Sequence, residues 1–183
     1  MAIETDRLTI RRFRGEDWED LHAYLSDPDV LRFEPYTPFD AEQCKLEAKR
    51  RATDEAFWAV CLKENGRLIG NLYFSGQAEK TWELGFVFHA SYQGKGYALE
   101  SARALIDHAF LKWNMRRVIA LCNPKNEKSW RLLERLGMRR EGHLIQNVSF
   151  HKDESGNPIY TDTYEYGLLR EEWERCARDR RLS

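Results

Sequence analysis

One stretch of the chain, residues 82–110, most constrains what it can fold into. Residues 82–88 are apolar and rich in aromatic side chains, which suits the half-buried surface of a β-strand. From residue 98 to residue 110 apolar side chains recur at the spacing that places one helix face against a core. Residues 93–98, with the sequence QGKGYA, lie between these two segments. The stretch therefore predicts a strand, a glycine loop and a helix in direct succession.

The glycine loop is a candidate anion-binding site. Gly94 and Gly96 let the backbone approach a ligand closely, and the first N–H groups of the next helix have no acceptor inside that helix. Helix N-termini favour phosphate, and Lys95 adds a positive charge. The loop has neither the GxGxxG spacing of a dinucleotide fold nor the ending of a P-loop, which disfavours NAD and nucleoside triphosphates. A loop that only turns the chain is the structural alternative.

The loop also resembles the acyl-CoA signature of the GCN5-related N-acetyltransferases (GNAT), Gln/Arg-x-x-Gly-x-Gly/Ala. Gln93, Gly96 and Ala98 occupy its three defined positions. The resemblance covers nearly the whole chain and includes residues 123–130 and 136–138. The opening residues 5–11 (TDRLTIR), the segment ELGF and the closing residues 168–173 are similar to the Rim-type branch, the ribosomal-protein N-terminal acetyltransferases.

Periodicity and turn signals predict an α/β (α+β) fold. Seven strands are expected, at residues 3–13, 56–62, 68–74, 82–88, 117–122, 144–150 and 159–169. Helices are expected near residues 18–25, 40–53, 98–110, 123–136 and 170–180, with a helical turn at 29–32. Asn123 or Asn126 would cap the fourth of these helices, Gly137 would end it, and Trp173 and Ala177 would anchor the fifth. Asn65-Gly66 predicts an antiparallel hairpin, and a helical crossover makes the fourth and fifth strands parallel. The resemblance implies a GNAT-like, mostly antiparallel sheet in which this parallel pair splays, within one domain of residues 1–183.

Composition limits the possible partners and location. Charged residues make up 32% of the chain but the net charge is −1, so no overall field favours nucleic acid or an anionic membrane. No apolar run approaches the roughly 18 residues of a membrane helix, and the N-terminus is too polar for a signal peptide, so we expect a cytoplasmic protein. The four cysteines are widely spaced, without a CxxC pair, and predict neither a metal site nor a disulfide framework.

The resemblance implies that acetyl-CoA is the cosubstrate and that no metal takes part. Main-chain groups near the end of the fourth strand would pair with the pantetheine arm, the glycine loop would bind the diphosphate, and an asparagine would hold the arm. The corresponding residues are Phe86, Val87, Phe88, Gln93, Gly94, Lys95, Gly96, Tyr97, Ala98 and Asn126.

Two residues are candidates for proton transfer during acetylation. Glu83 is the candidate base, because burial beside aromatic side chains would raise its pKa, and a sheet-surface salt bridge is the alternative. Ser129 lies one helical turn from Asn126 and is the candidate acid for the departing sulfur, with simple packing as the alternative. Leu133 stands where a more widespread family pattern has a tyrosine, and residues 146–149 lack the glutamate described for Rim-type enzymes.

The predicted reaction is direct attack of a primary amine on acetyl-CoA, most readily by a protein or peptide α-amine. An α-amine with pKa about 7.7–8.0 is neutral far more often at pH 7 than a lysine side chain with pKa about 10.4. Residues 33–39 are either acceptor contacts or an ordinary surface loop. The alternatives are acetylation of a small amine or an aminoglycoside, and a catalytically silent acyl-CoA-binding module. We expect a monomer or a homodimer.

Overall fold

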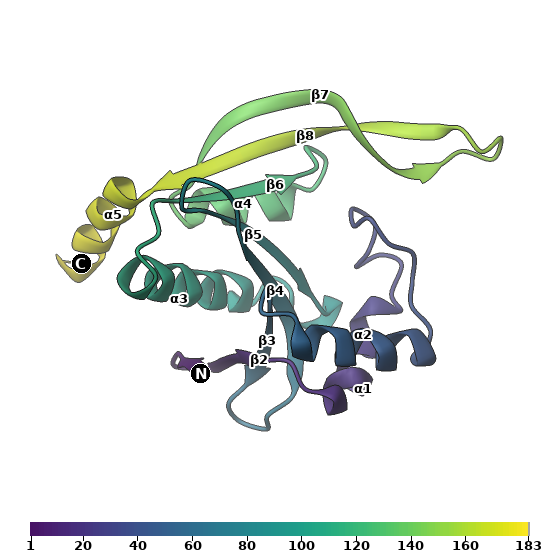
Figure 1. Cartoon of the computed structure of the whole chain (residues 1–183), viewed down its shortest axis with the longest axis horizontal. Helices are drawn as coiled ribbons and strands as arrows, with labels where there is room; N and C mark the ends of the chain where they lie inside the picture. The colour runs from purple at the N-terminus through teal and green to yellow at the C-terminus, as the bar shows by residue number, and fades with distance from the viewer. Residues whose placement is uncertain (183) are drawn as a thin grey trace. The chain divides into compact units, whose positions relative to one another are not determined.

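The computed structural model describes residues 1–182 (Figure 1). The elements are β1 (Ala2–Glu4), β2 (Leu8–Arg12), η1 (Gly15–Asp17), α1 (Trp18–Leu25), α2 (Ala41–Thr53), β3 (Phe57–Leu62), β4 (Leu68–Gly76), β5 (Thr81–Phe88), η2 (Ala90–Tyr92), α3 (Tyr97–Lys112), β6 (Arg117–Cys122), α4 (Glu127–Arg135), β7 (Arg139–Lys152), β8 (Pro158–Leu169) and α5 (Arg170–Leu182). The strand order is β1-β2-β3-β4-β5-β6-β8-β7, in an eight-stranded sheet. The predicted mixed α/β fold is confirmed, with one strand more than expected.

The chain forms two compact units. Unit 1 contains Met1–Ser75 and Gly85–His108, and unit 2 contains Gly76–Leu84 and the chain from Ala109 onward. The boundaries lie inside β4, β5 and α3, so each of these elements contributes residues to both units. The single domain expected from the sequence stays a prediction.

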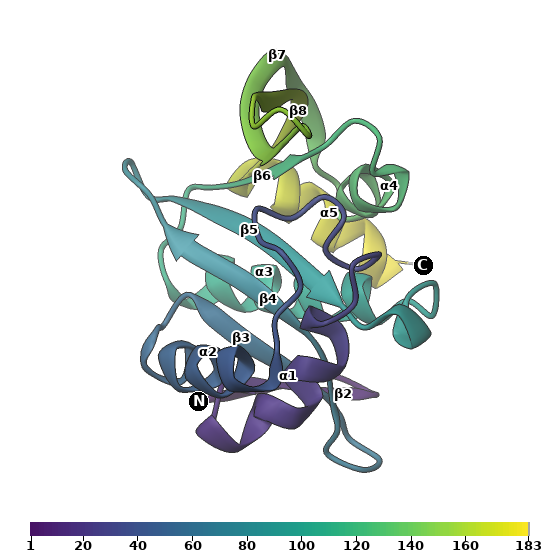
Figure 2. The same ribbon diagram turned by 90° about the vertical axis from the view of Figure 1, so that its right-hand side faces the viewer.

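In unit 1, helices cover both faces of the antiparallel strands β2, β3 and β4. Helices α1 and α2 lie on one face and α3 lies on the other (Figure 2). Side chains alternate along β3, so Ala59 and Cys61 both point toward α1 and α2. The buried residues of this core are Phe13, Leu21, Tyr24, Leu25, Leu31, Cys44, Ala48, Ala59, Cys61, Leu68 and Val87.

The first strand expected from the sequence is in fact two strands. Leu8 and Ile10 alternate with polar residues and no Gly or Pro interrupts residues 3–13, but the chain reverses at Thr5 so that β1 pairs antiparallel with β2, with Ile3 opposite Ile10. The Thr5 N–H donates to the Leu8 carbonyl at 2.9 Å, and the Leu8 N–H donates to the Thr5 hydroxyl at 3.0 Å. The Thr5 side chain thus closes a turn that no Gly or Pro marks in the sequence.

Unit 2 contains the predicted parallel pair. The parallel ladder joins the first three residues of β5 and β6, from Thr81–Arg117 to Glu83–Ile119. Strand β8 pairs antiparallel with both β6 and β7, and β7 and β8 continue as a long two-stranded ribbon (Figure 1). The ring of Trp173 on α5 stacks on Phe110, with centroids 5.0 Å apart, which confirms Trp173 as an anchor of the terminal helix.

Strand β7 is longer than predicted and irregular. Residues 145–147 of β7 lie opposite one residue of β8, because Leu144 pairs with Thr163 and Val148 pairs with Thr161. Gln146 has a φ of 48°, and its N–H donates to the Asp162 carboxylate at 2.9 Å. Such a bulge interrupts the ladder, because three residues of β7 occupy the place of one and the backbone of Gln146 leaves the extended conformation.

Two local predictions were correct in detail. Gly66 (φ 74°) turns the hairpin between β3 and β4. Gly137 (φ 90°) ends α4, where its N–H donates to the Glu134 carbonyl and the Met138 N–H donates to the Leu133 carbonyl. The expected helical turn at residues 29–32 is an isolated turn, closed by the Leu31 N–H and the Asp27 carbonyl.

Within residues 1–182, no helix has both the length and the apolar character needed to cross a membrane.

Candidate functional site

The glycine loop in unit 1 links the end of β5 to the start of α3. The Gln93 side-chain amide donates to the Phe88 carbonyl at 3.0 Å, which attaches the loop to the strand. Gly94 and Gly96 have φ of 75° and 85°, a region that side chains with a Cβ rarely adopt. The Gly96 carbonyl then accepts from the Glu100 N–H at 3.0 Å, inside the first turn of α3. Both glycines are therefore required by the backbone that leads into the helix.

Basic side chains surround this loop. The exposed Lys95 ammonium lies 5.4 Å from the centroid of the Tyr92 ring. Arg7, from the turn between β1 and β2, donates from Nη1 to the Lys95 carbonyl at 3.1 Å and pairs with Glu100 at 2.6 Å. Sequence reasoning did not identify Arg7 or Glu100 as site residues, although the segment 5–11 that contains Arg7 was part of the family resemblance.

In unit 2, Glu83 is a partly buried carboxylate at the start of β5. Its Oε2 accepts from the Gln77 side-chain amide at 3.3 Å, and no ion pair joins it to any residue that the structure describes. Burial raises the pKa of Glu83, as the sequence predicted. The salt-bridge alternative is therefore not supported, whereas a carboxylate that holds a proton more readily suits a base.

Asn126 and Ser129 meet at the start of α4. Asn126 is the N-cap, and its Oδ1 accepts from the Ser129 N–H at 3.2 Å. Of the two asparagines that could have capped this helix, Asn126 is therefore the one that does. Because the carbonyl group of its side chain is used in the cap, the Nδ2 group is the part of Asn126 suited to donate to a ligand.

Ser129 also contacts Cys122 at the end of β6. Burial raises the pKa of the Cys122 thiol to about 11, and a hydrogen bond with the Ser129 side chain partly offsets this. The thiol therefore stays protonated at neutral pH, which argues against a nucleophilic role for Cys122. Leu133, where the family pattern has a tyrosine, is fully buried one turn further along α4.

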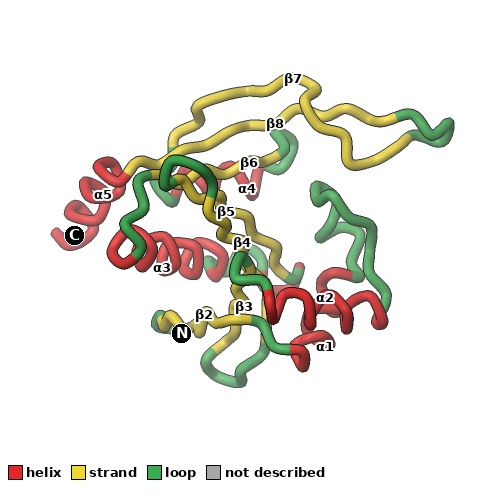
Figure 3. Tube along the Cα trace, viewed as in Figure 1, coloured by secondary structure: helices red, strands yellow, loops and turns green. Residues whose placement is uncertain are grey.

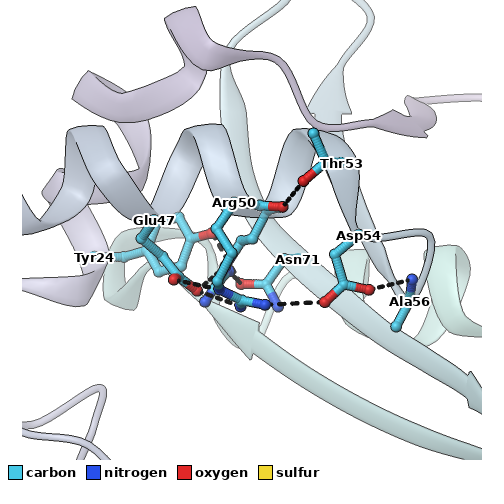
Figure 4. Close-up of polar contacts among 8 residues, drawn as sticks. Tyr24, Glu47, Arg50, Thr53, Asp54, Ala56 and Asn71 are labelled. Carbon is cyan, nitrogen blue, oxygen red and sulfur yellow. Dashed lines mark hydrogen bonds and ion pairs between the residues drawn. The ribbon is translucent and has the colours of Figure 1, made fainter.

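A buried polar cluster lies under α2 in unit 1 (Figure 4). Arg51 is only 2% exposed, donates from Nε to Glu47 at 2.7 Å and donates from Nη1 to the side-chain Oδ1 of Asn71 at 3.0 Å. The Tyr24 hydroxyl donates to the same Asn71 oxygen at 2.9 Å. The cluster places an ion-paired guanidinium inside the unit.

Residues 33–39, the candidate acceptor contacts, contain Glu34, a second carboxylate with a raised pKa. It lies in the loop between α1 and α2, which Figure 3 draws in green. Burial raises the pKa of Glu34 to about 7, and a hydrogen bond with Tyr36 and the charge of Arg51 partly offset the effect of burial. Tyr36 and Phe39 pack against the core, so this loop is more than a plain surface turn. No pattern in the sequence indicated Glu34 as unusual, because its burial depends on this packing.

Comparison with known proteins identifies the family. Residues 7–139 match the family described as "Acetyltransferase (GNAT) domain". The chain belongs to the GNAT family. Over 175 residues this GNAT chain is 38% identical to "Uncharacterized N-acetyltransferase YnaD" of Bacillus subtilis, covering 94% of this chain and 99% of that one. It is thus an N-acetyltransferase.

Solved GNAT structures share its fold. A GNAT acetyltransferase from Bacillus anthracis is 35% identical, with a TM-score of 0.85 and coverage of 93% of this chain and 99% of the other. The ribosomal-protein-S5-alanine acetyltransferase of Vibrio fischeri is 22% identical, with a TM-score of 0.75 and coverage of 94% and 98%. Spermidine N-acetyltransferase from Vibrio cholerae, in complex with CoA and spermine, is 19% identical, with a TM-score of 0.76 and coverage of 93% and 99%. The last two likenesses establish the fold alone.

The predicted site residues of this GNAT enzyme are divided between the two units. Phe86, Val87, Phe88 and the loop at residues 93–98 belong to unit 1, where Gln93 joins the strand to the loop. Glu83 and the pair of Asn126 and Ser129 belong to unit 2. Among the residues described, no group of three or more His, Cys, Asp or Glu side chains could hold a metal ion.

Proposed function

We propose that this enzyme transfers the acetyl group of acetyl-CoA to the α-amine of a protein or peptide. The choice of donor rests on the glycine loop. In this loop Gly94 and Gly96 both have positive φ, and Gly96 directly precedes the first residue of α3. Helix N-termini bind phosphate through their unpaired N–H groups and their dipole. Membership of the GNAT family supports the same donor.

The proposal assigns the donor's parts to different segments. Loop residues Gln93, Gly94, Lys95, Gly96, Tyr97 and Ala98 bind the diphosphate. Main-chain groups of Phe86, Val87 and Phe88 pair with the pantetheine arm. The Nδ2 group of Asn126 donates to a carbonyl of that arm, because its Oδ1 caps α4.

In the chemical step, the neutral amine nitrogen attacks the thioester carbonyl carbon. A C–N bond forms, the C–S bond breaks and CoA leaves as a thiolate. Glu83 accepts the amine proton, directly or through a water molecule, since its raised pKa favours the protonated product. Ser129 donates a proton to the thiolate and recovers it from solvent. Direct attack requires no metal, nucleic acid or membrane, and either a monomer or a homodimer could perform it.

The choice of an α-amine as acceptor depends on the energy of deprotonation. An enzyme acting on lysine must offset about 2.5 pK units more than one acting on an α-amine, or ~3–4 kcal/mol. Glu83 is only partly buried and is the one base proposed, so the α-amine is the easier acceptor. The resemblance of residues 5–11 to Rim-type enzymes favours the same acceptor.

Three acceptors offered separately at pH 7 test the proposal. They are a lysine-free peptide with a free N-terminus, the same peptide with a blocked N-terminus and one lysine, and spermidine. CoA release is followed with a thiol reagent, and the product is identified by intact mass. We expect the free N-terminus to give the largest kcat/KM. Faster lysine labelling would refute the α-amine choice. Faster spermidine labelling would instead favour the small-amine alternative, which the 25% identity to Escherichia coli spermidine N(1)-acetyltransferase already raises.

A further inference from the structure

We propose that Arg7 is a positioning residue for the diphosphate-binding loop, acting through the Lys95–Gly96 peptide and through Glu100. This inference rests on the proposed function, because it assumes that the loop binds the diphosphate of CoA. Arg7 lies in the turn between β1 and β2, 93 residues before Glu100, and nothing in the local sequence pattern assigns it to the loop.

Arg7 and Thr5 surround the Glu100 carboxylate with hydrogen bonds. Arg7 reaches Oε2 from Nε at 2.7 Å and from Nη2 at 2.6 Å, and its main-chain N–H reaches Oε1 at 3.2 Å. The Thr5 hydroxyl donates to Oε1 at 2.6 Å. Both oxygens of a carboxylate in the first turn of α3 are therefore held by one turn of unit 1, which fixes the start of the helix.

The remaining arm of the Arg7 guanidinium orients the loop itself. Its Nη1 donates to the Lys95 carbonyl at 3.1 Å. In a trans peptide the C=O and the next N–H point in opposite directions, so this bond turns the Gly96 N–H away from Arg7. The guanidinium also lies 4.4 Å from the Tyr97 ring centroid, and a Cβ on Gly96 would approach its Nη2 to 3.3 Å. Arg7 therefore contacts three successive residues of the proposed phosphate site.

Charge gives Arg7 a second effect. Burial raises the pKa of Glu100, but the hydrogen bonds from Thr5 and Arg7 outweigh burial and hold that pKa below its ordinary value. Glu100 is therefore ionised, and a carboxylate beside a diphosphate would repel it. Arg7 offsets this charge, so removing Arg7 both releases the loop and leaves an anion beside the ligand.

Binding of CoA by calorimetry tests the inference without requiring an acceptor. Relative to the wild type, Arg7→Gln should weaken CoA binding about tenfold or more, the equivalent of ~1.4 kcal/mol. Arg7→Lys should recover only part of the affinity, because an ammonium lacks the planar fork that reaches both Glu100 and Lys95. Arg50→Gln is the matched control, since Arg50 is an ion-paired, 49% exposed arginine of α2 and Arg7 is 47% exposed.

Steady-state kinetics with two donors separates loop positioning from a general loss of structure. For Arg7→Gln the KM for acetyl-CoA should rise about tenfold, whereas kcat at saturation should change by less than about twofold. With S-acetylpantetheine, which lacks the diphosphate, wild type and variant should have the same kcat/KM. An equal loss with both donors would overturn the inference.

Binding by further variants separates a positioning role of Arg7 from its absence. CoA binding by folded Arg7→Gln that equals wild-type binding would overturn the inference, and if Arg7→Gln does not fold, unchanged binding by Arg7→Lys would do so. Glu100→Gln combined with Arg7→Gln should bind CoA more tightly than Arg7→Gln alone, because the repelling charge is gone. A wild type that binds CoA but acetylates no amine would refute the proposed function and leave the test of Arg7 intact.

Discussion

Replacing Glu34 by glutamine should stabilise the protein at neutral pH and have little effect below pH 4.5. Burial raises the pKa of Glu34 from 4.5 to about 7 in the folded protein, with smaller opposing effects of Tyr36 and Arg51. Between these two values the folded state keeps its proton while the unfolded chain loses it. The stability contributed by protonated Glu34 is thus fully present below pH 4.5 and is lost as the pH rises through 7. Glutamine is neutral at every pH and avoids that loss.

The structure sets the size of the effect. The two pKa values differ by about 2.5, which gives an upper bound of ~3.4 kcal/mol at 1.36 kcal/mol per pKa unit. Because Glu34 is only partly buried, solvent screening should reduce this to about half, ~1.5–2 kcal/mol. For a chain of this length that corresponds to a Tm increase of about 3–8 °C above pH 7.

Thermal unfolding followed by circular dichroism at pH 4.5, 6, 7 and 8 measures this difference. The gap in Tm between Glu34→Gln and wild type should be near zero at pH 4.5 and largest at pH 8. Glu64→Gln, which changes an exposed glutamate in the hairpin between β3 and β4, is the control and should show no such trend. A gap of the same size at all four pH values would refute the assignment of a raised pKa to Glu34.

Three further predictions follow from backbone conformation and from the start of α4. Gly96→Asp should weaken CoA binding at least tenfold, because Gly96 has a φ of 85° and an added carboxylate repels phosphate; calorimetry showing wild-type affinity in the folded variant would contradict the loop assignment. Asn126→Ala should raise the KM for acetyl-CoA, and loss of the helix cap should lower stability by about 1 kcal/mol. Ser129→Ala should mainly lower kcat, and a change in kcat below about twofold would make Ser129 a packing residue. Gly137→Ala should destabilise the protein more than Gly156→Ala in urea unfolding, since both have positive φ but only at Gly137 would a Cβ approach another side chain, the Cys176 sulfur at 3.3 Å. Equal losses at the two glycines would show that the backbone accounts for the whole effect.

The sequence by itself determined the features that depend on residues close together in the chain. The strand, loop and helix around residues 93–98, the Asn65-Gly66 hairpin and the glycine that ends α4 were all predicted. Each follows from local periodicity or from the φ angles that glycine alone adopts easily. The parallel pairing of β5 and β6 also followed, since a helix between two neighbouring strands carries the chain back to the end where the first strand began.

Only the tertiary structure decided which polar side chains meet and how deeply each is buried. The contact of Arg7 with Glu100 spans 93 residues, and the pKa of Glu34 depends on how its loop packs near Arg51 of α2. Strands β1 and β2 were predicted as one strand, because the turn that Thr5 closes between them contains no Gly or Pro. Periodicity reports which face of an element is buried, whereas pairing between distant side chains and loss of water around a carboxylate arise only when the chain has packed.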